Sequence, residues 1–234
     1  MAAPTVSISS LEALQQYVAR EHHPQWRRWR YRGHSKASYR LVPKVGRDAR
    51  MAGMEAKLFK AWKQHSVAFL ENGLTEWDRI AIAQHHGLAT RLLDWTFNPL
   101  AAAFFATVKA DGAVDTDHDS AIYAHYSTLD PIEQADPRAP LLIEGIRRYV
   151  PSAVVPRIVR QGGIFTIHGP ATLDLEDHLP PGDQLQKLVI AKECKLQLAQ
   201  QLSHFGINQL SMFPDLDGVS RHVNWTFQHL PDVP

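Results

Sequence analysis

The sequence predicts an α+β fold: a single domain with a mixed central sheet and helices concentrated in the N-terminal half. Apolar residues at helical spacing recur through the first half, whereas short apolar or alternating runs typical of strands are dispersed along the chain. No repeat, low-complexity tract or linker divides the 234 residues. We therefore treat residues 1–234 as one domain, with an N-terminal helix at 9–20 and core motifs between 26 and 218.

The first half contains three expected helices and a strand pair. Ser9 or Ser10, followed by Glu12, is the N-cap pattern that opens the helix at 9–20. Thr75 caps another helix, and Gly87 ends it. The ranges expected here are 26–33 and 39–42 for strands, and 54–70 and 78–86 for helices.

The second half alternates strands with polar excursions. Leu92, Leu93 and Trp95 suit a short buried strand, and Asn98 with Pro99 starts the apolar helix that follows. The C-terminal stretch 206–218 ends in a turn glycine. The other expected elements are strands at 120–126, 161–169 and 185–190, a helix through 196–205, and surface loops at 111–119 and 131–140.

Composition limits the class of protein. A hydrophobic content of 44% with 21% charged residues is globular, and no apolar stretch approaches the length of a membrane helix. The N-terminus has neither the basic nor the apolar region of a secretory signal. The single cysteine, Cys194, excludes an intramolecular disulfide. We therefore expect a cytoplasmic protein with no membrane partner.

Basic and aromatic residues are interleaved between residues 20 and 50. A net charge of +1 gives no global case for nucleic-acid binding, but this local pattern could serve phosphates and bases together. The same alternation also describes a strand with one solvated face, so both interpretations stay open. The basic residues are Arg27, Arg28, Arg30, Arg32, Lys36, Arg40, Lys44 and Arg47, and the aromatic ones are Trp26, Trp29, Tyr31 and Tyr39.

The segment 83–99 concentrates titratable and aromatic side chains between apolar flanks. Arg91, Asp94 and Thr96 surround the expected junction between a strand and a helix. A helix N-terminus presents free N–H groups, which favour an anion. His85 and His86 are adjacent and cannot both face one ion from a regular helix, so we expect no metal site. The segment predicts an anion-binding site.

These motifs resemble the FRG domain family, which is named after a Phe-Arg-Gly motif. Tyr31-Arg32-Gly33 stands in that place, with tyrosine instead of phenylalanine. The long block from Gln84 to Thr96 is the specific part of the resemblance. The other matching motifs are Leu41-Val42-Pro43 with Arg47, Glu55, Gln161 to Phe165, and Phe213 to Gly218.

A second, fold-level resemblance is to ADP-ribosyltransferases of the arginine-serine-glutamate type. Tyr31-Arg32-Gly33 resembles the strand whose arginine binds the NAD phosphates. The segment from Asp94 to Thr96, with the helix that follows, resembles the Ser-Thr-Ser strand and its helix. Gln161 to Thr166 occupies the place of the third strand, with Gln161 where that family has its catalytic glutamate.

The second resemblance implies an ADP-ribosyltransferase-like enzyme that binds NAD and transfers ADP-ribose to a protein or nucleic-acid acceptor, as a toxin or phage-defence effector would. A nucleic-acid-binding or nucleic-acid-cleaving module and a non-catalytic nucleotide sensor are the alternatives. Arg32, Asp94 and Gln161 are the catalytic candidates. The cofactor-binding candidates are Gly33, His34, Tyr39, Arg91, Trp95, Thr96 and Phe165.

Overall fold

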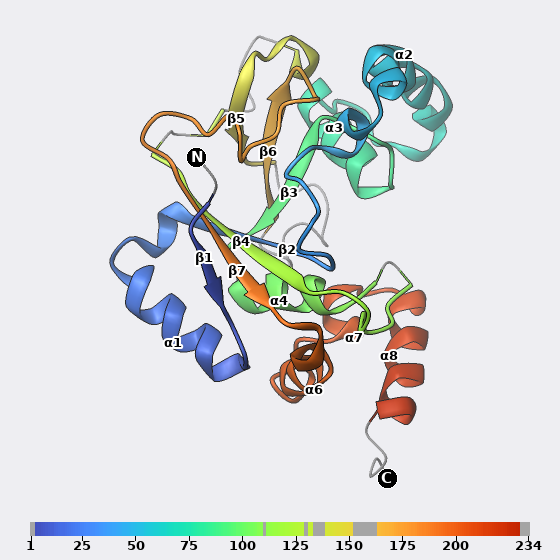
Figure 1. Cartoon of the computed structure of the whole chain (residues 1–234). Coiled ribbons are helices and arrows are strands. Elements are labelled where there is room, and N and C mark those ends of the chain that lie inside the picture. Colours follow the sequence, from blue (N-terminus) through green and yellow to red (C-terminus); the bar gives the residue numbers. More distant parts are fainter. Residues whose placement is uncertain (1–2, 110, 129–130, 133–138, 152–162, 230–234) are drawn as a thin grey trace.

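A computed structural model describes residues 3–109, 111–128, 131–132, 139–151 and 163–229. It confirms an α+β domain, with a seven-stranded open mixed sheet and seven helices in that part of the chain (Figure 1). The strands are β1 (Thr5–Ser7), β2 (Trp29–His34), β3 (Leu92–Thr96), β4 (Ser120–Tyr126), β5 (Gly145–Tyr149), β6 (Gly163–Gly169) and β7 (Gln184–Ile190). The helices are α1 (Leu11–Glu21), α2 (Ala49–Ser66), α3 (Glu76–His85), α4 (Pro99–Thr107), α6 (Lys195–His204), α7 (Gln209–Met212) and α8 (Leu216–His229).

The strand order is β1-β7-β4-β2-β3-β6-β5. The edge strand β1 is parallel to β7, and every other neighbouring pair is antiparallel. The three strands that carry the candidate motifs, β2, β3 and β6, are therefore consecutive neighbours in the middle of the sheet. None of the described helices has the length and apolarity that a membrane crossing requires.

Side-chain caps fix where the early helices begin. The Ser10 side chain accepts a hydrogen bond from the Ala13 amide at the start of α1. Thr75 and Asp78 form a reciprocal capping box at the start of α3. Asp48 caps α2, so that helix begins five residues before the expected position at 54. Local polar side chains, rather than apolar spacing, therefore set these boundaries.

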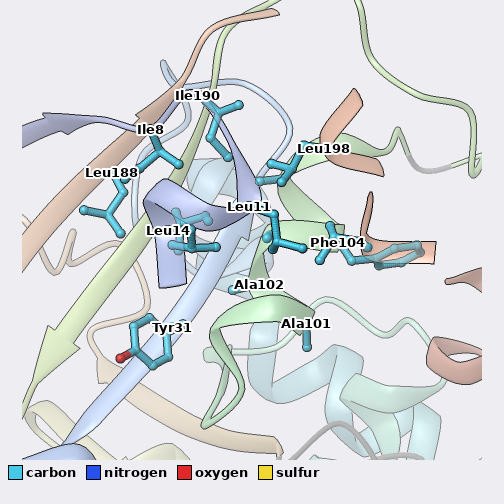
Figure 2. Packing of buried hydrophobic residues seen from close by; sticks show 14 of the residues in the cluster. Ile8, Leu11, Leu14, Tyr31, Ala101, Ala102, Phe104, Leu188, Ile190 and Leu198 are labelled. Carbon is cyan, nitrogen blue, oxygen red and sulfur yellow. The ribbon is translucent and has the colours of Figure 1, made fainter. Parts of the chain in front are cut away.

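One large core cluster joins α1, α4, α6 and α7 to β1, β2, β4 and β7. Figure 2 shows Leu11 and Leu14 of α1 beside Leu188 and Ile190 of β7, with α4 close by. A second cluster joins α2 and α3 to β3, β5 and β6. The two clusters meet the sheet on either side of the β2–β3 boundary.

A third cluster uses the opposite pleat of the central strands. Leu93 and Trp95 of β3 alternate with residues of the second cluster, and they pack with Tyr123 of β4. Leu41 and Leu175, both from irregular segments, are fully buried in this cluster. These irregular segments therefore bury the pleat that faces away from the helices.

The central feature of the sheet is the divergence of β2 from β3. Only Tyr31 and Thr96 are paired between these strands. Beyond that pair β2 continues against β4 as far as His34, whereas β3 continues against β6 as far as Leu92. An uninterrupted antiparallel register would place Gly33 opposite Asp94. Instead the sheet opens between these two residues.

Several sequence expectations about element boundaries are wrong. Residues 23–28 form a 3-10 helix rather than the start of β2. Residues 39–42 form no strand. The Leu41 carbonyl accepts a hydrogen bond from the amide of Leu175, which lies in an irregular segment and not in a neighbouring strand. The expected C-terminal turn glycine, Gly218, lies inside α8. Both edge strands, β1 and β5, were also missed, because each is short and lacks a distinct apolar alternation.

Gly33 is required by the contact between β2 and α4. A Cβ atom at this position would lie 2.0 Å from the Ala102 carbonyl oxygen and 2.6 Å from the Ala106 amide nitrogen. Both atoms belong to the backbone of α4, so no side chain can move to make room. The glycine of the Tyr-Arg-Gly motif thus allows the helix to lie directly on the strand.

We predict that Gly33→Ala destabilises the fold by about 3 kcal/mol or more, because backbone must be displaced. Urea unfolding followed by circular dichroism measures the loss. Gly53→Ala is the matched control, because a Cβ there meets no atom within 4 Å beyond its chain neighbours and the nearby backbone of its own helix. Equal stability of the Gly33 variant and the wild type would contradict this packing.

Candidate functional site

A cavity of about 410 Å³ lies at the opening between β2 and β3. Its walls come from β2, β3 and β6, from Ala102 and Phe105 of α4, and from Gln84 and His85 at the end of α3. Ser35, Tyr39 and Arg47 from the segments after β2 complete it. Its volume is within the range of small-ligand and cofactor sites.

Arg32 bridges the opening. Its Nη1 donates to the Asp94 carbonyl oxygen at 2.7 Å and lies 3.6 Å from the Asp94 carboxylate. Its Nε donates to His34 Nε2 at 2.8 Å. The guanidinium therefore spans the gap where strand pairing has ended. Its Nη2 has no hydrogen bond to another described residue, so it is available to a ligand.

His34 holds Arg32 in place as a neutral ring. Because Nε2 accepts from Arg32, the ring proton belongs to Nδ1, which faces the Tyr39 carbonyl at 3.3 Å. Burial, followed by the charge of Arg32, holds the pKa of His34 well below its ordinary value. Burial also lowers the pKa of Arg32, and the Asp94 carboxylate opposes that effect.

The Asp94 carboxylate is fixed from the other side by α3. Gln84 Nε2 donates to Asp94 Oδ2 at 2.9 Å. The Thr90 hydroxyl donates to Gln84 Oε1 at 2.6 Å and so sets the orientation of the amide. The Asp94 side chain is 57% exposed, so its second oxygen is open to the cavity or solvent. The result is a carboxylate in a defined position beside a guanidinium.

The charge of the cavity favours an anion. Arg32 and Arg47 both line it, and Asp94 is the only carboxylate among its described lining residues. The charge of Arg47 adds to the effect of burial in lowering the pKa of Arg32. Tyr39, 47% exposed, and the buried Phe165 add aromatic surface. Two cations beside aromatic rings suit a ligand with both phosphate and an aromatic base.

The structure brings eight of the ten candidate residues together at this cavity. Gln161 lies outside the described residues, and Arg91 does not line the cavity. The candidates that line it are Arg32, Gly33, His34, Tyr39, Asp94, Trp95, Thr96 and Phe165.

Arg91 belongs to a buried ion pair. Its guanidinium makes two-pronged contacts with Glu55 of α2, including Nη2 to Oε2 at 2.7 Å, and its Nη1 donates to the Leu141 carbonyl. The Arg91 amide also donates to Glu55. The expectation that Arg91 contacts a cofactor does not fit this arrangement. The pair instead attaches α2 to the start of β3.

The N-terminus of α4, where the sequence predicted an anion, does not line this cavity. Asn98 caps α4 through the Leu100 amide, and the cavity touches the side of that helix at Ala102 and Phe105. The basic stripe of residues 20–50 is likewise divided. Arg30 is buried and Arg40 pairs with Asp174 and Asp177, so these cations do not form one surface.

Arg47 and Gln84 are among the cavity residues that the site prediction did not include, although their motifs were recognised. Arg47 follows Leu41-Val42-Pro43, and its Nε donates to the Val42 carbonyl, which folds the segment back toward β2. Gln84 opens the block that ends at Thr96, and it contacts Asp94 ten residues later. Both residues have polar side chains and belong to recognised motifs, and this combination could have indicated that they line the cavity. Only the tertiary fold shows which motif residues face one cavity.

A possible metal group, Asp115, Asp117 and His118, lies away from this cavity. Its ligand atoms lie within 4.8 Å of one another. Lys109 Nζ lies 2.8 Å from Asp117, and the fully buried Lys195 Nζ lies 3.8 Å from Asp115. These lysines compensate the carboxylates, so this group gives no case for a cation.

Comparison with known proteins supports one of the two resemblances that the sequence motifs indicated. The family model of the FRG domain matches residues 27–114, which include Tyr31-Arg32-Gly33, Arg47, Glu55 and the block from Gln84 to Thr96. No curated protein and no solved structure matches the chain. The likeness to the FRG domain over residues 27–114 is therefore supported, and the likeness to ADP-ribosyltransferases receives no support from these comparisons.

We predict that Arg91→Ala destabilises the fold by about 3–5 kcal/mol, because it leaves the buried Glu55 carboxylate without its guanidinium partner. Chemical unfolding measures the loss. The double variant Glu55→Ala with Arg91→Ala should lose less than the sum of the single losses. Additive losses would show that the two residues do not act as a pair.

A buried polar chain supports β3 and β6 behind the cavity. Trp95 Nε1 donates to the Thr166 hydroxyl at 3.1 Å, and Thr166 contacts His168 Nε2 at 2.9 Å. His168 Nδ1 lies 2.8 Å from the Leu173 carbonyl. The ring is fully buried, and burial lowers its pKa to about 4. The chain is built for a neutral histidine.

This lowered pKa predicts acid sensitivity. An unfolded histidine takes up a proton below about pH 6.5, whereas folded His168 stays neutral until about pH 4. Its contribution to the free energy of unfolding should therefore fall by about 2 kcal/mol between pH 7 and pH 5. Urea titrations should show a smaller pH dependence for His168→Gln than for the wild type. The exposed His204→Gln variant is the control and should keep the wild-type dependence.

Proposed function

We propose that the chain is an ADP-ribosyltransferase-like enzyme that binds NAD in the cavity between β2 and β3. In this proposal it transfers ADP-ribose to a macromolecular acceptor, in the setting of a toxin or a phage-defence effector. The observation that carries the proposal is the adjacency of β2, β3 and β6 around one opening lined by Arg32 and Asp94. These are the three strands whose motifs resemble those of the transferases.

Binding would use the cationic wall. A dinucleotide brings two negatively charged phosphates, and a guanidinium can donate to two oxygens of one phosphate. Arg32 offers its free Nη2, and Arg47 lies near enough to affect its pKa. A bound diphosphate would relieve the repulsion between the two cations. Tyr39 and Phe165 line the cavity and would contact the adenine or nicotinamide ring.

Transfer would break the bond between nicotinamide and the ribose C1′ atom. The leaving nicotinamide keeps the electron pair of that bond, and positive charge develops on the ribose. A carboxylate stabilises this charge, as in glycoside hydrolysis. An acceptor nucleophile then bonds to C1′ and loses its proton. Asp94, oriented by Gln84, is the carboxylate available for this role among the described lining residues.

A non-catalytic nucleotide sensor is the alternative supported by a specific observation. Asp94 is 57% exposed, and its electrostatic effect is therefore reduced by solvent. The described cavity lining contains no glutamate. A sensor would bind NAD or ADP-ribose and gain thermal stability without releasing nicotinamide.

We predict that Arg32→Ala weakens NAD binding by about 10-fold to 100-fold, because charge-assisted hydrogen bonds to phosphate are lost. Arg32→Lys should also weaken NAD binding, because a lysine ammonium cannot donate two parallel hydrogen bonds to one phosphate as a guanidinium does. Calorimetric titration with NAD and with ADP-ribose is the measurement. Arg40→Ala is the matched control: its exposed guanidinium pairs with Asp174 and Asp177 and does not line the cavity.

The same preparations distinguish enzyme from sensor. Chromatographic detection of free nicotinamide should show turnover in the wild type, and Asp94→Asn should lower that turnover about 100-fold with little change in NAD affinity. Binding without nicotinamide release favours the sensor. Undetectable binding of both NAD and ADP-ribose by the folded wild type would refute the assignment of this cavity.

A further inference from the structure

The outer face of α2 carries positive charge only. Arg50, Lys57 and Lys60 are exposed, and none has a hydrogen bond or ion pair with another described residue. The single carboxylate of α2, Glu55, is buried against Arg91. The charged side chains of α1, α3 and α8 include both signs, and α4 has none. In a chain of net charge +1, this face is a local concentration of unpaired cations.

These cations lie on one side of the helix. Arg50, Gly53, Lys57, Lys60 and Gln64 follow each other at three-residue or four-residue steps, and all are exposed. We call these five residues the basic face of α2. The first residue of the face, Arg50, follows the cavity residue Arg47 by three residues in the sequence.

Gly53 is the second observation that points to a partner. A glycine within a helix is destabilising relative to alanine, so it needs a reason. Apart from its chain neighbours and the nearby backbone of α2 itself, no atom of the described residues lies within 4 Å of the position where its Cβ would stand, so packing against the rest of the protein does not explain it. The glycine leaves bare backbone between Arg50 and Lys57. Such a gap lets an external chain approach the helix closely.

The far end of α2 adds exposed apolar surface. Phe69 is 87% exposed and Val67 is 72% exposed, in the turn that follows the helix. Phe69 follows Lys60 by nine residues in the sequence, and a nucleic-acid strand can place its phosphates on cations and a base on an exposed aromatic ring. An amphipathic protein helix would instead need an apolar groove along the face. Small and polar residues occupy that place between the cations.

We propose that the basic face of α2, together with Phe69, binds a single-stranded nucleic acid. The phosphates lie along Arg50, Lys57 and Lys60, the backbone of the strand passes over Gly53, and a base stacks on Phe69. The surface is separate from the cavity and does not depend on the proposed NAD chemistry. Its position next to Arg47 would bring a bound strand to the rim of the cavity.

The test is fluorescence anisotropy of the full chain with a labelled 12-nucleotide single-stranded DNA at 50 mM and 200 mM KCl. The wild type should bind, and added salt should weaken the binding steeply. Lys57→Glu combined with Lys60→Glu should lower affinity at least about 10-fold and flatten the salt dependence. Phe69→Ala should weaken binding of the single strand several-fold and leave duplex binding unchanged.

The matched control is Arg20→Glu combined with Lys192→Glu. It makes the same change in net charge with exposed residues of α1 and of the 3-10 helix Lys192–Cys194, which precedes α6. In Figure 1, α1 and α6 lie far from α2. The control should change affinity less than about threefold, because only nearby charge contacts the strand. Equal weakening by both double variants would overturn the proposal, as would the absence of salt-sensitive binding by the wild type. Equally effective competition by polyglutamate of matched charge would also overturn it, in favour of an acidic protein partner.

Gly53→Ala separates binding from folding. The melting temperature should rise, because alanine favours the helix, while affinity for the DNA falls. Arg32→Ala should leave DNA affinity unchanged, so failure of the NAD proposal and failure of this one are distinguishable. A Gly53 variant with higher stability and undiminished DNA affinity would remove the argument for close approach.

Discussion

The bridge that Arg32 makes between β2 and β3 is the interaction on which the site depends. Strand pairing ends after Tyr31 and Thr96, and the backbone carbonyl of Asp94 then receives a guanidinium N–H instead of an amide N–H. The Arg32 side chain spans a greater distance than a backbone hydrogen bond between paired strands. The bridge therefore connects β2 to β3 and leaves the two strands apart. The opening therefore persists as a cavity with a cation fixed in its wall.

This arrangement requires that His34 is neutral and that position 33, the last of the Tyr-Arg-Gly motif, is a glycine. If His34 were protonated, its Nε2 could no longer accept from Arg32, and two cations would face each other. Burial prevents that protonation. Gly33 lets α4 lie directly on β2, which places Ala102 and Phe105 in the cavity wall. The Tyr-Arg-Gly motif thus combines one polar function with one steric function.

Local signals in the sequence predicted the elements that carry the site, and they did not predict every partner across the fold. Caps and apolar runs identified α3, β3 and α4, and motif order placed Arg32 and Asp94 in one site. Arg91 could not be assigned from spacing, because its partner Glu55 is 36 residues away. The edge strands were missed because pairing with neighbours, rather than local composition, makes them strands.

The ion pair between Arg91 and Glu55 also explains the charge on the surface of α2. Since Glu55 is the only carboxylate of that helix, its burial with Arg91 removes the one negative charge from the exposed side. The same ion pair attaches α2 to the beginning of β3, whose other end forms the cavity wall. Arg91, a cofactor-binding candidate in the sequence, thus orients the helix beside the cavity. One buried pair therefore determines both the position of the basic face and its uniform charge.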